Sequence, residues 1–122
     1  MKLKVYWQGL DGLDKKNLEK AIKKEIEAEG IKKAVEVSVS LVDEQTMTGF
    51  NQQYMGKSGA TDVLAFPLEK EVGPDEVMRL GDVVVCRPVA ERQARTQRMG
   101  LEAEVARLIG HGVRHLLGIH HK

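Results

Sequence analysis

The segment LEAEVARLIGHGVRHLLGIHH, residues 101–121, decides how the end of this chain folds, because its apolar residues recur at helical spacing. It predicts an amphipathic helix that packs one stripe of side chains against the rest of the protein. The stripe consists of Leu101, Val105, Leu108, Ile109, Gly112 and Leu116. Gly118 is expected to end the helix, since glycine readily adopts the left-handed conformation that follows a last helical turn.

All four histidines of the chain lie in this segment, and His111 and His115 lie at the edge of the apolar stripe. His111 and His115 stand four residues apart, so their imidazoles project from one helix face and suit a single metal ion. If the chain folds back after Gly118, His121 reaches the same ion. Three neutral nitrogen ligands with an open fourth position are typical of catalytic zinc. We predict one Zn²⁺ per chain held by His111, His115 and His121 in a groove between helix and sheet; the alternative is an incidental cluster.

The histidine spacing is also that of the ligands in metzincin proteases. Those enzymes carry a glutamate base beside the first ligand, whereas this chain has Gly112. Peptide hydrolysis of that type needs the carboxylate to take a proton from the metal-bound water, so the pattern disfavours a metalloprotease.

Upstream of this segment, hydrophobic patterning predicts four strands and three helices. Residues 3–7 and 35–41 alternate as half-buried strands, 61–67 is an apolar strand closed by Pro67, and 80–86 is a β-branched buried run. One helix is expected from the cap Asp14 to Gly30 and a second from the cap Asp43 to Tyr54. A third is expected from Pro88, in its first turn, to about Met99.

Composition sets the broad class of the protein. A chain of 122 residues with 42% hydrophobic and 30% charged residues is expected to form one globular domain. Its net charge of +1 does not by itself indicate a nucleic-acid partner. The single cysteine, Cys86, excludes an internal disulfide, fits a reducing compartment and is expected to be a core residue. No signal peptide or membrane span is recognisable, so we expect a cytoplasmic protein.

Three ordered stretches resemble the signatures of the YbeY family. They are TDVLAFP at 61–67, LGDVVVC at 80–86, and the terminal HGxxHLxGxxH at 111–121; Asn51, Tyr54, Gly56 and Lys57 also resemble the approach to the first signature. The resemblance covers essentially the whole chain. It implies an α/β (α+β) fold, with helices packed on a mixed four-stranded sheet. It also implies a zinc-dependent endoribonuclease that cleaves single-stranded RNA, matures the 3′ end of small-subunit ribosomal RNA (rRNA) and acts in ribosome quality control.

The resemblance also assigns roles to individual residues. His111, His115 and His121 match the zinc ligands, and residues matching the cleft lining are Thr61, Asp62, Leu80, Gly81 and Asp82. Met55 replaces an arginine usual in the family, and His120 replaces a carboxylate. The chain stops at Lys122, so residues 1–122 are expected to form one YbeY-like domain that lacks the usual C-terminal extension.

Several side chains keep two interpretations. Lys57 either takes part of the role of the missing arginine in binding substrate or is a solvated loop residue. Asp62 and Asp82 either orient the ligand imidazoles or cap strand ends. His120 is either a proton shuttle or a solvent-facing residue. The arginine series Arg87, Arg92, Arg95 and Arg98 either tracks an RNA backbone or pairs with the acidic loop near Asp75 and Glu76.

Three functions are compatible with these patterns. The first is a zinc-dependent endoribonuclease that acts on ribosomal RNA. The second is a non-catalytic, zinc-stabilised module associated with the ribosome. The third is a metal-dependent hydrolase of another substrate.

Overall fold

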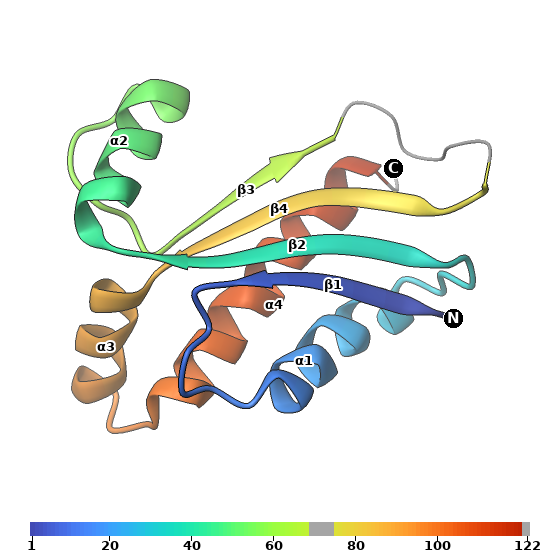
Figure 1. Ribbon diagram of the computed structural model, residues 1–122, viewed down its shortest axis with the longest axis horizontal. Coiled ribbons are helices and arrows are strands. Elements are labelled where there is room, and N and C mark those ends of the chain that lie inside the picture. Colours follow the sequence, from blue (N-terminus) through green and yellow to red (C-terminus); the bar gives the residue numbers. More distant parts are fainter. Residues whose placement is uncertain (69–74, 121–122) are drawn as a thin grey trace.

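The computed structural model describes residues 1–68 and 75–120 as one mixed sheet with helices packed on it, which confirms the expected α/β (α+β) class (Figure 1). In chain order the elements are β1 (Leu3–Gln8), α1 (Lys15–Ala28), β2 (Val35–Val42), α2 (Glu44–Met55), β3 (Val63–Pro67), β4 (Met78–Cys86), α3 (Arg87–Thr96) and α4 (Leu101–His120). The strand order is β1-β2-β4-β3. β1, β2 and β4 run parallel, and β3 is an antiparallel edge strand. Among the described residues, no helix is long and apolar enough to cross a membrane.

Local signals set most of the element boundaries. The Asp14 carboxylate accepts the Lys16 N–H at 2.9 Å and so caps α1. Asp43 caps α2 in the same way, through the Thr46 N–H at 2.8 Å. These two caps and the predicted strands are confirmed, with shifts of one or two residues at their ends.

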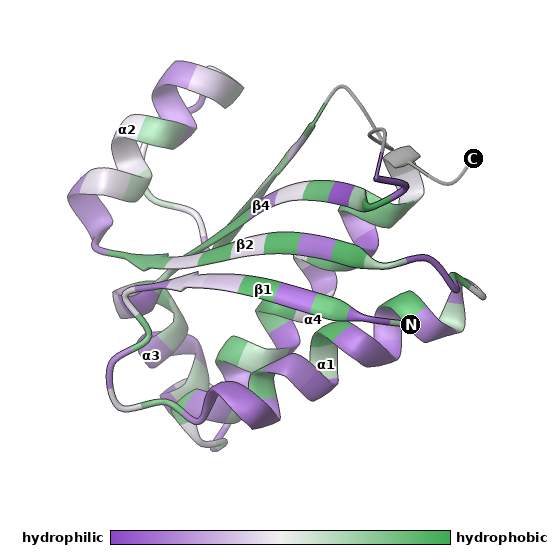
Figure 2. Ribbon diagram, turned by 45° about the vertical axis from the view of Figure 1, so that its right-hand side comes forward, coloured by the Kyte–Doolittle hydropathy of each residue, from purple (hydrophilic) through white to green (hydrophobic). Residues whose placement is uncertain are grey.

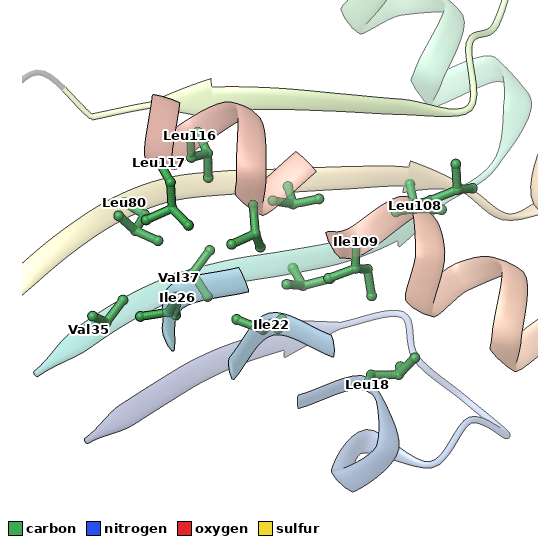
Figure 3. Close-up of a cluster of buried hydrophobic side chains, with 14 of the residues drawn as sticks. Leu18, Ile22, Ile26, Val35, Val37, Leu80, Leu108, Ile109, Leu116 and Leu117 are labelled. Atoms are coloured by element: carbon green, nitrogen blue, oxygen red, sulfur yellow. The ribbon is translucent and has the colours of Figure 1, made fainter. Parts of the chain in front are cut away.

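The main core lies between the sheet and the pair α1 and α4 (Figure 3). Leu18, Ile22 and Ile26 of α1 and Leu108, Ile109, Leu116 and Leu117 of α4 meet Val35, Val37 and Leu80 from the sheet, all nearly inaccessible to solvent. Figure 2 shows the alternation of hydrophobic and hydrophilic residues along β1 and β2 that turns one side of each strand toward this core. The apolar stripe of α4 therefore fixes which face of that helix is left for the histidines.

The prediction that Gly118 ends the last helix is wrong. The helix α4 continues through this residue to His120. Glycine permits a left-handed end but also accepts helical angles, at a cost of roughly 0.5–1 kcal/mol relative to alanine. Burial of Leu116 and Leu117 in the preceding turn outweighs that cost.

Candidate functional site

A small pocket of about 160 Å³ lies between the edge strand β3 and α4. His111 and His115, both exposed, lie on its helix side, one turn apart. The remaining lining residues are Gly112 of α4, Met55 at the end of α2, and Val63, Leu64 and Ala65 of β3. The pocket thus combines two imidazoles with an almost wholly apolar wall.

The structure brings together two of the three predicted zinc ligands. Imidazoles at this spacing on one face can supply two ligands of one metal ion. His121 and the side chain of His120 lie outside the described residues. The predictions that His121 is a zinc ligand and that His120 is a proton shuttle or a solvent-facing residue therefore stay predictions. Within the described residues there is no group of three His, Cys, Asp or Glu side chains placed to hold a metal.

Gly112 is required by the packing of α4 on the sheet. A Cβ atom at this position would lie 2.7 Å from Cγ1 of Val83 and 3.4 Å from Cγ2 of Val63. A glutamate beside His111 would therefore require α4 or the Val83 side chain to shift. This packing strengthens the sequence argument against a protease-type base at this position.

Thr61 and Asp62 precede β3 and do not line the histidine pocket. Asp62 Oδ1 accepts a hydrogen bond from the Val63 N–H at 2.7 Å, and Asp62 Oδ2 accepts one from the side-chain amide of Gln93 at 3.3 Å. Asp62 thus acts at the start of a strand, as the capping interpretation expected. Among the described residues, no hydrogen bond joins Asp62 to His111 or His115.

Asp82 lies on the opposite face of the sheet from the histidines. Its neighbour Val83 faces Gly112 of α4, and successive side chains of a strand alternate between faces. Asp82 instead lines a groove of about 690 Å³ over the face that carries α2. The interpretation of Asp82 as a carboxylate that orients the ligand imidazoles is therefore wrong.

That groove contains an aromatic cluster that the sequence did not indicate. Phe50, Tyr54 and Phe66 pack edge to face or tilted, with ring centroids 5.2–6.1 Å apart. Tyr54 remains 56% exposed. Two of these residues come from α2 and one from β3, so only the tertiary structure brings them together.

No lysine or arginine side chain of the described residues lines the pocket. Met55, where the family usually has arginine, is 51% exposed and lines the pocket with its thioether side chain. Lys57 is exposed and does not line it; its backbone N–H donates to the Asn51 carbonyl at 3.2 Å as part of the end of α2. The solvated interpretation of Lys57 agrees with this position.

The arginine series on α3 is partly neutralised. Arg92 pairs with Glu44 of α2 at 2.6 Å, and Arg87 lies 3.6 Å from Glu91. Asp75 of the acidic loop pairs with Arg79 of β4 at 2.7 Å, and residues 69–74 of that loop lie outside the described part of the chain, so the alternative pairing with the loop stays a prediction. The predicted basic stripe is therefore interrupted at Arg87 and Arg92, and Arg98 lies beyond the end of α3.

An ion pair one turn before His111 was not singled out from the sequence. Arg107 Nε and Nη2 each donate to the Glu104 carboxylate at 2.8 Å. The Glu104 side chain is fully buried, whereas that of Arg107 is 50% exposed. The hydrogen bonds to Glu104 raise the pKa of Arg107 above its usual value, and the charge of Asp62 adds to this increase. The signal in the sequence was an acid and a base three residues apart, ending one turn before the first histidine.

The amino-acid sequence of this chain matches a known protein family. The family described as Endoribonuclease YbeY matches residues 8–122. The endoribonuclease YbeY of Aquifex aeolicus is 48% identical over 88 residues, which cover 72% of this chain and 57% of that protein. The Persephonella marina endoribonuclease YbeY is 37% identical over 110 residues, covering 90% of this chain and 71% of that protein. The chain thus spans little more than half the length of the Aquifex relative.

A solved structure has the same fold. The solution structure of TM1509 from Thermotoga maritima superposes with a TM-score of 0.62 and 30% sequence identity, covering 98% of this chain and 75% of that one. The family match covers the chain from the last residue of β1 through α4. On this evidence, the chain belongs to the YbeY family.

Proposed function

We propose that this protein is a metal-dependent endoribonuclease that cleaves single-stranded RNA. The observation that carries the proposal is the shared pocket of His111 and His115 on α4 in a chain of the YbeY family. The relatives are named endoribonucleases. As the natural substrate we propose the 3′ end of small-subunit rRNA on the ribosome, reached in the cytoplasm.

The proposed metal is one Zn²⁺ per chain, held by His111, His115 and His121. The two described imidazoles fit this role, because both are exposed, neighbouring on one face and turned to one pocket. Bound zinc supplies a water that ionises near neutral pH and a Lewis acid for phosphate oxygens. The protein itself orients the imidazoles through the packing of α4. Residues 1–122 are proposed to form the catalytic domain.

The walls of the pocket suit a phosphodiester group. A volume of about 160 Å³ is roughly five times the share of one liquid water, about 30 Å³. The side chains of Met55, Val63 and Ala65 form an apolar wall beside the two exposed imidazoles. Because β3 is an edge strand, the pocket lies at a border of the sheet that an extended chain can follow. We propose Thr61, Asp62 and Lys57 as flanking contacts to the substrate.

The test combines metal analysis with cleavage of a fluorescent single-stranded RNA. We expect one zinc per chain, loss of cleavage with EDTA, and a decrease of more than about hundredfold in His115→Ala. His120→Ala is the matched control, since it removes a histidine outside the proposed ligand set and should retain zinc. Full cleavage by the metal-free protein would refute the proposal.

Met55 favours a second candidate, a non-catalytic zinc-stabilised module associated with the ribosome. A thioether on the pocket wall cannot bind phosphate bidentately as a guanidinium does. One zinc per chain without RNA cleavage, together with a lower melting temperature after EDTA treatment, would support this candidate. Hydrolysis of peptides but not RNA would favour a hydrolase of another substrate, which the packing of Gly112 disfavours.

A further inference from the structure

The Arg107 side chain lies on the same side of α4 as the proposed metal site. Arg107 and His111 are four residues apart in one continuous helix, so they are neighbours on one face, about one turn or 5.4 Å apart along the axis. Asp62, which directly precedes Val63 of the pocket wall, is close enough for its charge to add to the rise in the pKa of Arg107. Arg107 therefore lies next to His111 on the helix face that carries the histidines, although it does not itself line the pocket.

The guanidinium is held in a way that leaves one edge available. Nε and Nη2 bind Glu104, and within the described residues Nη1 has no hydrogen-bond partner. A guanidinium has five N–H donors, so the two on Nη1 and one on Nη2 remain for another anion. Because Glu104 is fully buried and Arg107 half exposed, the free edge is directed away from the core. A guanidinium already fixed in orientation loses little further freedom when it binds a ligand.

A second arginine–glutamate ion pair on α4 differs from the first because it connects two helices. Arg114 Nε and Nη2 bind the two oxygens of Glu25 at 3.1 Å each. Glu25 belongs to α1, so this pair ties two helices together. The Glu104–Arg107 pair joins residues of one helix, and within the described part of the chain its hydrogen bonds tie no other element to α4. Burial of a carboxylate for a local contact is costly, and apolar residues often replace such pairs without loss of stability.

We infer that Arg107 is a phosphate-binding residue for single-stranded RNA and that Glu104 positions it. The Nη1–Nη2 edge would donate two hydrogen bonds to a backbone phosphate adjacent to the one at the histidines. One helical turn separates the residues Arg107 and His111 along α4, and neighbouring phosphates of one strand would bridge their side chains. The nearby Asp62 carboxylate is occupied by the Val63 N–H and the Gln93 amide. The inference rests on the proposed function for the identity of the ligand.

The test measures binding separately from cleavage. Anisotropy of a fluorescent single-stranded oligoribonucleotide is recorded in EDTA over a range of salt concentrations. We expect Arg107→Met to weaken binding about tenfold. The slope of log K against log[salt] should decrease in magnitude by about 0.7, the value for one phosphate contact on a single strand. Arg107→Lys should weaken binding several-fold and keep the slope, because it retains the charge and loses the fork.

Arg114→Met is the matched control, since it removes the same type of paired arginine from the same helix on the side facing α1. Its binding should change less than twofold. Because Arg107→Met leaves Glu104 buried without its partner, the double variant Glu104→Leu, Arg107→Met keeps the test valid if the single variant unfolds. The double variant should show the same loss of affinity and slope. Glu104→Gln should lower affinity while the slope stays unchanged, which marks Glu104 as acting through Arg107.

The outcomes separate this inference from the proposed function. Equal binding by wild type, Arg107→Met and Arg114→Met overturns the inference, even if zinc-loaded protein cleaves RNA. Selective loss in Arg107→Met without any cleavage by the zinc-loaded wild type supports the inference and refutes the nuclease. Absence of binding by the wild type itself overturns both.

Discussion

The two faces of the sheet differ sharply in what covers them. The face toward α1 and α4 is filled by interlocking aliphatic side chains, and the helices cover it along its length (Figures 1 and 3). On the other face, α2 packs a smaller cluster around Met47 and Leu64, beside a groove bordered by Ser40 and Asp82. The closed face provides the stability and fixes α4, and therefore the histidines, in place. The open face leaves polar and aromatic groups accessible.

The largest expected effect is on the closed face. Ile109→Ala removes a fully buried side chain from the centre of the core and should lower the free energy of unfolding by about 3 kcal/mol. Gln8→Ala, an exposed change bordering the open groove, is the control and should cost less than about 0.5 kcal/mol. Urea denaturation measures both. If both variants lost a similar amount of unfolding free energy, the two faces of the sheet would contribute equally to stability.

A smaller effect is expected where α4 approaches the sheet most closely. Gly112→Ala places a Cβ atom 2.7 Å from Val83 Cγ1, so overpacking should cost about 2 kcal/mol. Gly118→Ala adds a methyl with no neighbour within 4 Å and should stabilise the helix by roughly 0.5 kcal/mol. Thermal unfolding compares the two variants. A stable Gly112→Ala protein would show that α4 can shift without loss, and that the pocket position is not fixed by this contact.

On the open face, Asp82→Asn tests whether a carboxylate on this side of the sheet contributes to zinc affinity. We expect a change in stability below about 0.5 kcal/mol and no change in zinc affinity, because Asp82 lines the groove opposite α4. A carboxylate that oriented a ligand histidine would instead alter metal affinity about 10–100-fold. Competition with a chelating dye measures that affinity. A tenfold loss would contradict the placement of Asp82.

The smallest effect concerns the polar network formed by Asp75, Arg79 and Glu36. Hydrogen bonds from Arg79 and then from the Val77 N–H lower the pKa of Asp75 from 3.8 to about 2. Because the folded-state pKa is the lower one, the stabilisation is complete above pH 4 and is lost as the pH falls through about 2. Asp75→Asn should therefore unfold at slightly lower urea than wild type at pH 6, and the difference should shrink toward pH 2.5. A difference independent of pH would mean that the ionised carboxylate is not its source.

Signals confined to neighbouring residues were sufficient for most of the fold. A cap such as Asp43 acts on an N–H three residues away, and the alternation in Val35–Val42 reflects the two sides of one strand. The same holds for His111 and His115, whose common face follows from helical geometry alone. In each case the interacting groups belong to one element, so their spacing in the sequence determines their spacing in the protein.

Tertiary packing decided what involves several elements at once. The side of the sheet to which Asp82 belongs depends on the contact of Val83 with α4, and the apolar pocket wall depends on Met55 arriving from α2. Gly118 could permit either a helix end or a helix interior, and the burial of the preceding leucines selected the interior. The sequence alone thus determined the helices, the strands and the histidine pair. Only the three-dimensional packing determined which groups share a pocket, because contacts between distant segments compete with and override local preference.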